Sequence, residues 1–167
     1  MSDSQKNRAY AWESSFKSFN EHSVPRLRLR RLIRSAERRY RIPPVTIEFM
    51  ERVRKHKRYA KIASEYIPET HTITLGWNDH NYAIALHEVS HAIVDYILGY
   101  ELEPHGPHWL GVYMWLLGWA KVAPTEALEA SARVHGLTWC SAGKIGPEKI
   151  RTTYRRMVRI ADENRDV

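Results

Sequence analysis

A short run of histidine and glutamate in the middle of the chain has the clearest chemical meaning in the sequence. Residues 86–92 read L-H-E-V-S-H-A, which contains the pattern His-Glu-x-x-His. Residues four apart on a helix lie one turn apart on the same face, so His87 and His91 can present imidazole nitrogens to one metal ion. Glu88 is turned far enough to take a proton from a water molecule on that ion, as a general base does. We expect Zn²⁺, because zinc readily accepts imidazole nitrogen.

The residues around the motif favour this interpretation over an ordinary core network of hydrogen bonds. The surrounding segment is strongly apolar, with Ala83, Ile84, Leu86, Val89, Ala92, Ile93 and Ile97. Burial of two histidines and a glutamate in such a segment is costly unless a partner satisfies them. A metal ion is a partner of that kind.

A third metal ligand is expected after His91, because catalytic zinc usually has three protein ligands and leaves a fourth position to water. Asp95 is one turn further along the same face, but a third ligand on one unbroken helix would diverge from the metal. We therefore expect Asp95 to support a metal ligand by a hydrogen bond or to cap a neighbouring group. The remaining candidates are Glu101, Glu103, His105 and His108.

His105 is the favoured third ligand. It stands in the run P-H-G-P-H-W at residues 104–109, where Gly106 allows a tight backbone turn and Pro107 fixes the start of a helix. This turn would aim the His105 side chain back at the first helix. His108 is then expected beside the metal or facing a substrate, and it stays an alternative ligand together with both glutamates.

The helices that must hold these residues have start and stop signals. A helical period begins near Asn81 and continues to Gly99, a residue that favours a left-handed helix end. A second, apolar helix is expected over about residues 107–121, and a short third one over 124–136. A last helix, basic on one side, is predicted from Pro147.

Three short segments before the motif have the period of strands, at residues 45–49, 58–64 and 71–75. Their connections are short, and a parallel pair needs a crossover of about a dozen residues or more, so we predict an antiparallel three-stranded meander. The strand 71–75 is expected to be the edge that binds an extended substrate by main-chain hydrogen bonds. Strands combined with these helices predict a single α+β domain.

The 167 residues suffice for one compact domain and are too few for two. We divide the chain into a polar N-terminal arm (1–25), a core (26–123) and a basic helical extension (124–167) that packs on the same domain. The single cysteine, Cys140, excludes a disulfide framework and a Cys-rich zinc ribbon, which fits a reducing compartment. No secretory leader and no apolar run of about 17–25 residues is present, which predicts a soluble cytoplasmic protein that crosses no membrane.

Charge is distributed unevenly along the chain, although the total is +7. Residues 26–61 contain 14 basic and 3 acidic side chains, whereas residues 62–143 contain 2 and 9. A helix predicted from about residue 26 to Pro43 is apolar on one face and arginine-rich elsewhere. Arginine suits phosphate contacts, so single- or double-stranded DNA is the expected partner, and a merely solvated face is the alternative. The candidate DNA contacts are Arg30, Arg31, Arg34 and Arg38.

Together these motifs resemble the SprT-like (Spartan-like) zinc metallopeptidase domain, a zincin of the minigluzincin type. In that family His-Glu-x-x-His is followed by a loop and then by His-Gly-x-x-Phe or His-Gly-Pro-x-Phe, and here H-G-P-H-W occupies residues 105–109. The resemblance covers about residues 26–120 and implies a small zincin-like fold. It implies that His87, His91 and His105 bind zinc, that Glu88 is catalytic and that Trp109 takes the aromatic position.

The expected function is that of a zinc metalloendopeptidase acting on protein substrates, including DNA-associated or DNA-crosslinked proteins. Glu88 would take a proton from the zinc-bound water and deliver it to the leaving amine. The oxyanion needs a further donor, for which His108, Tyr113 and Tyr100 are candidates. Two alternatives are a non-catalytic module that binds nucleic acid or a partner, and a regulatory peptidase that cleaves one repressor-like protein. Glu88 disfavours the module, because a structural site needs ligands but no general base.

Overall fold

The structure, a computed structural model of the chain, describes residues 3–16, 19, 23–51, 54–55, 58–59, 63–99, 102–141 and 147. In this part of the chain lie the helices α1 (Lys6–Ser14), α3 (Arg26–Tyr40), α4 (Tyr82–Leu98), α5 (Pro107–Trp119) and α6 (Thr125–Val134). The strands are β1 (Thr46–Phe49), β2 (Arg54–Lys55), β3 (Arg58–Tyr59), β4 (Glu65–Ile67) and β5 (Thr72–Leu75), and a 3-10 helix, η1 (Pro68–Thr70), joins β4 to β5. The predicted α+β class is confirmed. The last predicted helix lies outside the described residues apart from Pro147.

The main sheet is mixed, and its strand order is β1-β5-β4. β5 runs parallel to β1, with Thr46 opposite Thr72, and antiparallel to β4, with Tyr66 opposite Ile73. The predicted antiparallel meander is therefore wrong. The connection from β1 to β5 contains β4 and the separate β2–β3 pair, and this length of chain supplies the crossover that a parallel pair requires.

The position of the strand next to the motif also differs from the prediction. β5 is the central strand of the sheet, with a neighbour on each side, so it is not the edge that was expected to bind substrate. β4 is one of the two edge strands, because like β1 it pairs with β5 alone in this sheet. The burial of the two strands agrees with these positions. β5 is buried along its whole length, whereas β4 is partly exposed.

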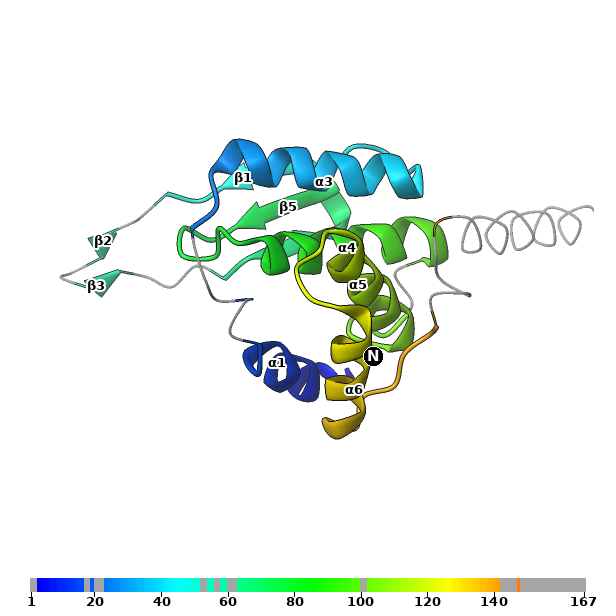
Figure 1. Cartoon of the computed structure of the whole chain (residues 1–167). Coiled ribbons are helices and arrows are strands. Elements are labelled where there is room, and N and C mark those ends of the chain that lie inside the picture. Colours follow the sequence, from blue (N-terminus) through cyan, green and yellow to red (C-terminus); the bar gives the residue numbers. More distant parts are fainter. Residues whose placement is uncertain are drawn as a thin grey trace, which may run out of the picture.

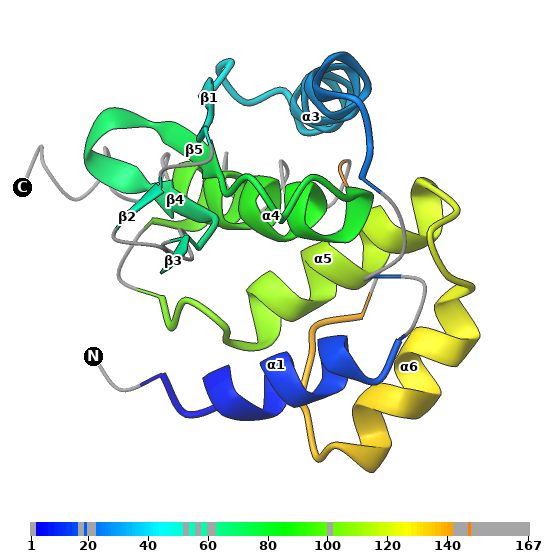
Figure 2. The ribbon, with the colours of Figure 1, turned by 90° about the vertical axis from the view of Figure 1, so that its left-hand side faces the viewer.

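α4 is the central helix and the element that carries the His-Glu-x-x-His motif. It packs against the sheet, α3 and α5, an arrangement visible in Figures 1 and 2. The Asn81 side chain caps its first turn by accepting a hydrogen bond from the Ile84 N–H at 2.8 Å. The helix ends at Gly99 as predicted, and the φ of +89° there suits a residue without a side chain, although the ψ of 152° lies outside the left-handed helical conformation that was expected. His87 and Glu88 therefore project from a mostly buried helix.

α3 places an apolar face on the core and most of its arginines outside. Its buried positions are Leu29, Ile33, Ala36, Glu37 and Tyr40. Glu37 is satisfied there by two hydrogen bonds from Arg34, at 2.7 and 2.9 Å, and one from the Val45 N–H at 2.8 Å. A buried carboxylate with three donors is well paired, and it ties the end of α3 to the start of β1.

α1 belongs to the packed structure, although it precedes the basic helix. Ala9 and Trp12 are fully buried, and the Trp12 ring meets the Tyr113 ring of α5 edge to face at 5.9 Å. Gln5 bonds to the chain beyond α6, where its side-chain oxygen accepts from the Thr138 N–H at 2.7 Å. Figure 2 shows α1 running beside α5 and next to α6. None of the helices described is both long and apolar enough to cross a bilayer.

Candidate metal centre

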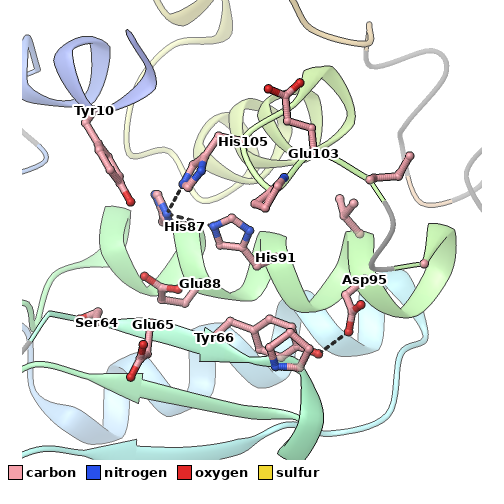
Figure 3. A pocket seen from close by; sticks show the side chains of 15 residues that line it. Tyr10, Ser64, Glu65, Tyr66, His87, Glu88, His91, Asp95, Glu103 and His105 are labelled. Atoms are coloured by element: carbon pink, nitrogen blue, oxygen red, sulfur yellow. Dashed lines mark hydrogen bonds between the residues drawn. The ribbon is translucent and has the colours of Figure 1, made fainter. Parts of the chain in front are cut away.

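Three imidazole rings converge on one point at the face of α4 that meets α1 and α5. Nε2 of His87 lies 3.2 Å from Nε2 of His91 and 3.4 Å from Nε2 of His105. One ligand atom from each ring lies within 4.8 Å of the others. Figure 3 shows two rings rising from α4 and the third entering from the loop before α5. These nitrogens are close enough to bind one metal ion together.

The loop before α5 brings the third histidine into place as the sequence predicted. Its backbone turns back where the Gly106 N–H donates to the Glu103 carbonyl at 2.9 Å. A Cβ at Gly106 would lie only 3.0 Å from that carbonyl oxygen. Glycine is needed here for close approach rather than for unusual dihedral angles, since its φ is −72°. Pro107 then occupies the first turn of α5, which fixes the direction in which His105 enters the site.

The other candidates for the third ligand lie elsewhere or outside the described residues. His108 is on the first turn of α5 and is not a member of the three-histidine group. The Glu103 carboxylate accepts a hydrogen bond from the Ser4 N–H and points away from the imidazoles (Figure 3). Glu101 lies outside the described residues.

Trp109 packs against all three rings from one side. Its ring centroid lies 4.7 Å from that of His87, 5.1 Å from that of His91 and 4.6 Å from that of His105. The indole N–H also points at the backbone carbonyl of His87, at 3.4 Å. This fully buried side chain therefore forms the apolar floor of the cluster.

Two carboxylates from the N-terminal segment form hydrogen bonds with the Nδ1 atoms of two of the rings. Asp3 lies 2.6 Å from Nδ1 of His105, and Glu13 lies 2.7 Å from Nδ1 of His87. Both carboxylates are mostly buried. The nitrogens that face each other are thus the Nε2 atoms, while the Nδ1 atoms of these two rings point outward to acceptors.

Burial and mutual repulsion keep most of this cluster uncharged. Burial, reinforced by His87 and His105, lowers the pKa of His91 well below its ordinary value. Burial also lowers the pKa of His105, against the effect of its hydrogen bond with Asp3. Burial acts on His87 in the same direction, but the Glu13 carboxylate outweighs it, and the pKa of His87 is raised. Neutral imidazole is the form that binds a metal, so His91 and His105 are suited to be ligands.

Glu88 is almost fully buried at the edge of the same cluster, between α4 and β4 (Figure 3). Burial raises its pKa to about 7, and the negative charge of Glu13 acts in the same direction. His87 and the backbone N–H of Tyr66 oppose this rise. The result is a carboxylate that is a better proton acceptor than an exposed glutamate.

A cavity of about 280 Å³ opens beside the imidazoles. Glu88 lines it together with residues of β4, and Tyr10 of α1 forms part of its wall. In Figure 3 the Tyr10 side chain reaches from α1 towards His87 and Glu88. Its ring centroid lies 5.2 Å from that of His105. A second cavity of about 340 Å³ shares Tyr10, Ser64, His87 and Glu88 with the first.

Of the oxyanion donors predicted from the sequence, neither Tyr113 nor His108 lines the first cavity, whereas Tyr10 does. Tyr113 is fully buried under His87, with ring centroids 5.5 Å apart, and burial raises its pKa well above the ordinary value. It lines the second cavity only. Tyr100 lies outside the described residues. His108 lines neither of the two cavities beside the imidazoles.

Asp95 supports a neighbouring side chain rather than an imidazole of the cluster. Its carboxylate accepts a hydrogen bond from the Tyr66 hydroxyl at 2.8 Å, drawn as a dashed line in Figure 3. The same hydroxyl lies 2.9 Å from Nδ1 of His71. Burial and Asp95 raise the pKa of Tyr66. This network ties α4 to the edge strand β4 and to the turn before β5.

The arginines proposed to contact DNA are only partly free of contacts within the protein. Arg34 is held by Glu37, Arg38 donates to the Ser35 hydroxyl at 3.0 Å, and Arg30 donates to the Ile47 carbonyl at 3.2 Å. Arg31 is exposed. Arg39 was not among these predicted contacts. Its guanidinium lies 5.5 and 5.1 Å from the ring centroids of Trp115 and Trp119 on α5.

Sequence reasoning missed three residues that face the cluster, namely Asp3, Tyr10 and Glu13. All belong to the polar arm to which no role had been assigned. The spacing from Tyr10 to Glu13 is that of neighbours on one helix face, and this is a weak signal on its own. Only docking of α1 shows which face meets the imidazoles.

Comparison of the chain with protein-family models, curated proteins and solved structures gave no significant match.

Proposed function

We propose that this protein is a zinc-dependent metalloendopeptidase of the SprT-like kind. The observation that carries the proposal is the convergence of three imidazoles beside a buried glutamate that lines the same cavity. A purely structural metal site needs ligands but has no use for a carboxylate held at the edge of an open cavity. Imidazole nitrogens suit zinc, and three protein ligands leave a position free for chemistry.

The reaction assigns a separate task to each of the chain's own groups. A bound zinc ion would supply a Lewis acid that acidifies water and polarises the peptide carbonyl. Glu88 accepts the proton at its carboxylate and delivers it to the nitrogen of the leaving amine. Tyr10 donates a hydrogen bond from its hydroxyl to the carbonyl oxygen as negative charge develops there.

The substrate in this proposal is an extended peptide lying along β4. This strand is an edge of the sheet, so its outer main-chain groups other than the Tyr66 N–H, which bonds to Glu88, can pair with another strand. Ser64, Glu65 and Tyr66 line the first cavity, and Ala63 and Ser64 line the second. A peptide that passes beneath Tyr10 occupies both cavities and brings a scissile bond to Glu88.

Metal analysis and proteolysis of an unstructured protein such as casein test this function. The purified protein should contain about one zinc per chain. His87→Ala should lose the metal and the activity, whereas Glu88→Gln should keep the metal and lose the activity, because Glu88 is not a ligand. A protein without stoichiometric metal, or a Glu88→Gln variant with full proteolysis, contradicts the proposal.

Nucleic-acid binding is a second candidate function. It is favoured by the group that Arg39 forms with Trp115 and Trp119. Trp115 and Trp119 lie with planes 11° apart and ring centroids 6.3 Å apart, beside a cavity that Arg38, Arg39 and Arg41 line. Arginines suit phosphates, and aromatic rings stack on unpaired bases. Such a surface would bring DNA-associated proteins to the metal centre.

Gel shifts with single- and double-stranded DNA at increasing salt test the second candidate. Affinity should fall steeply with salt, and Arg39→Ala should weaken binding while Arg133→Ala, an arginine of α6, leaves it unchanged. A missing or salt-independent shift contradicts DNA binding. Comparing cleavage of a DNA-crosslinked protein with cleavage of the same protein free in solution distinguishes a DNA-directed peptidase from one specific to a single regulatory protein.

A further inference from the structure

The N-terminal segment makes contacts to the metal centre that are more specific than packing. Of the three imidazoles, His87 and His105 have their Nδ1 atoms against carboxylates at 2.7 and 2.6 Å. Both acceptors, Glu13 and Asp3, come from the stretch around α1, which is far from either histidine in the sequence. The third ring, His91, is instead stacked on Trp109.

These two hydrogen bonds select which nitrogen of each ring is available to a metal. A neutral imidazole carries one proton, on either Nδ1 or Nε2. A carboxylate acceptor at Nδ1 keeps the proton there, which leaves the lone pair on Nε2. The Nε2 atoms are the ones that converge, at 3.2 and 3.4 Å from one another. Asp3 and Glu13 therefore favour the tautomer that a shared metal ion requires.

The two carboxylates are held in place by contacts along the whole segment. Trp12 is fully buried, and Arg8 donates to the Gly136 carbonyl at 2.7 Å. Gln5 donates to the backbone carbonyl of His105 at 3.3 Å and accepts from the Thr138 N–H. The segment is thus fixed to the same loop that supplies the third imidazole.

We propose that Asp3 and Glu13 are positioning residues of the metal centre, and that docking of α1 and binding of the metal stabilise each other. A carboxylate that orients a ligand strengthens metal binding. By thermodynamic reciprocity, the bound metal strengthens docking of the helix that carries the carboxylate. The proposal rests on the metal centre of the proposed function and not on which bond is hydrolysed.

Zinc affinity measured against a chromophoric chelator tests the positioning role. Glu13→Gln and Asp3→Asn keep the shape of each side chain and remove the charge, so each should weaken zinc binding about 10- to 100-fold. Glu126→Gln, on the exposed first turn of α6, is the matched control and should bind zinc as the wild type does. Unchanged zinc affinity in both site variants overturns the positioning role.

Hydrogen exchange of the α1 amides gives a readout that does not depend on activity. In the wild type, zinc should slow exchange over residues 9–13, and this protection should shrink in Glu13→Gln. Exchange in α1 that zinc does not alter overturns the linkage. The Asp3 side chain is not part of the hydrophobic core. Asp3→Asn therefore provides the affinity test even if Glu13→Gln folds poorly.

The outcomes separate this inference from the proposed function. A wild-type protein that binds no zinc overturns both. A protein that binds zinc through Asp3 and Glu13 but cleaves no substrate supports this inference and contradicts the peptidase. A zinc peptidase whose zinc affinity neither substitution changes supports the proposed function and contradicts this inference.

Discussion

The indole ring of Trp109 stacks on the imidazole ring of His91, with centroids 5.1 Å apart and planes 20° apart. The tryptophan lies two residues after Pro107 on the first turn of α5, whereas the histidine is in the middle of α4. This pair couples the position of the supporting helix to the position of a candidate ligand.

Replacement of Trp109 should weaken the fold. Trp109→Ala removes a fully buried ring and should lower the free energy of unfolding by about 3–5 kcal/mol. Trp109→Phe keeps a ring against His91 and should cost less, while it loses the indole N–H that faces the His87 carbonyl. Urea unfolding of the metal-free variants measures both values. An alanine variant as stable as the phenylalanine variant would argue against a packing role.

A methyl group at Gly106 should disturb the third ligand. The Cβ of Gly106→Ala would lie 3.0 Å from the Glu103 carbonyl oxygen and 3.1 Å from the Glu103 Cβ. Since one of these atoms is backbone, the loop has to give by a few tenths of an ångström, directly beside His105. We expect zinc affinity to fall by about tenfold or more.

Gly118→Ala is the matched control for that prediction. It introduces the same methyl group against the Thr125 side chain at the α5–α6 junction. This variant should change thermal stability without changing zinc affinity. Equal zinc affinity in the two glycine variants contradicts a specific role of the Gly106 turn.

The stability of the metal-free protein should depend on pH through Glu88. Its pKa in the folded state is about 7, against 4.5 for the ordinary side chain, so ionisation of Glu88 opposes folding. The stability contributed by the neutral form is present below about pH 4.5 and is lost as pH rises to 7. Glu88→Gln should thus match the wild type near pH 4.5 and exceed it at pH 8 by on the order of 3 kcal/mol.

Chemical denaturation of both metal-free proteins across this pH range provides the measurement. The remaining titratable groups are common to the two proteins, so the pH dependence of their difference reports the ionisation of Glu88 together with its coupling to His87. A difference that stays constant from pH 4.5 to 8 is incompatible with the raised pKa.

Removal of the Tyr10 hydroxyl should affect turnover and leave metal binding intact. The hydroxyl lies at the cavity wall near Glu88, and no hydrogen bond joins Tyr10 to an imidazole of the cluster in the described structure. Loss of an oxyanion donor typically lowers kcat by about 100-fold or more. Tyr10→Phe should show this loss with unchanged zinc affinity. Tyr82→Phe, at the exposed start of α4, is the control, and similar kcat values for the two variants would contradict the assignment.

The sequence alone determined the local parts of this site. The four-residue spacing of His87 and His91 places both on one helix face, whatever the helix packs against. Asn81 and Gly99 bound that helix through local hydrogen bonding and backbone conformation. The turn at Gly106 and Pro107 is likewise local, and for this reason the preference for His105 agrees with the geometry of the cluster.

Only the tertiary structure decided the relationships between distant segments. Parallel pairing of β1 with β5 depends on a long crossover, which alternation of apolar residues does not encode, so the antiparallel prediction was wrong. The prediction that β5 is an edge strand, where the structure has β4, was wrong for the same reason. Asp3, Tyr10 and Glu13 reach the imidazoles because Trp12 and Gln5 dock α1 against α5 and the chain after α6. Residue spacing reports what one helix or turn can do, whereas docking depends on surfaces that form only when the whole core is packed.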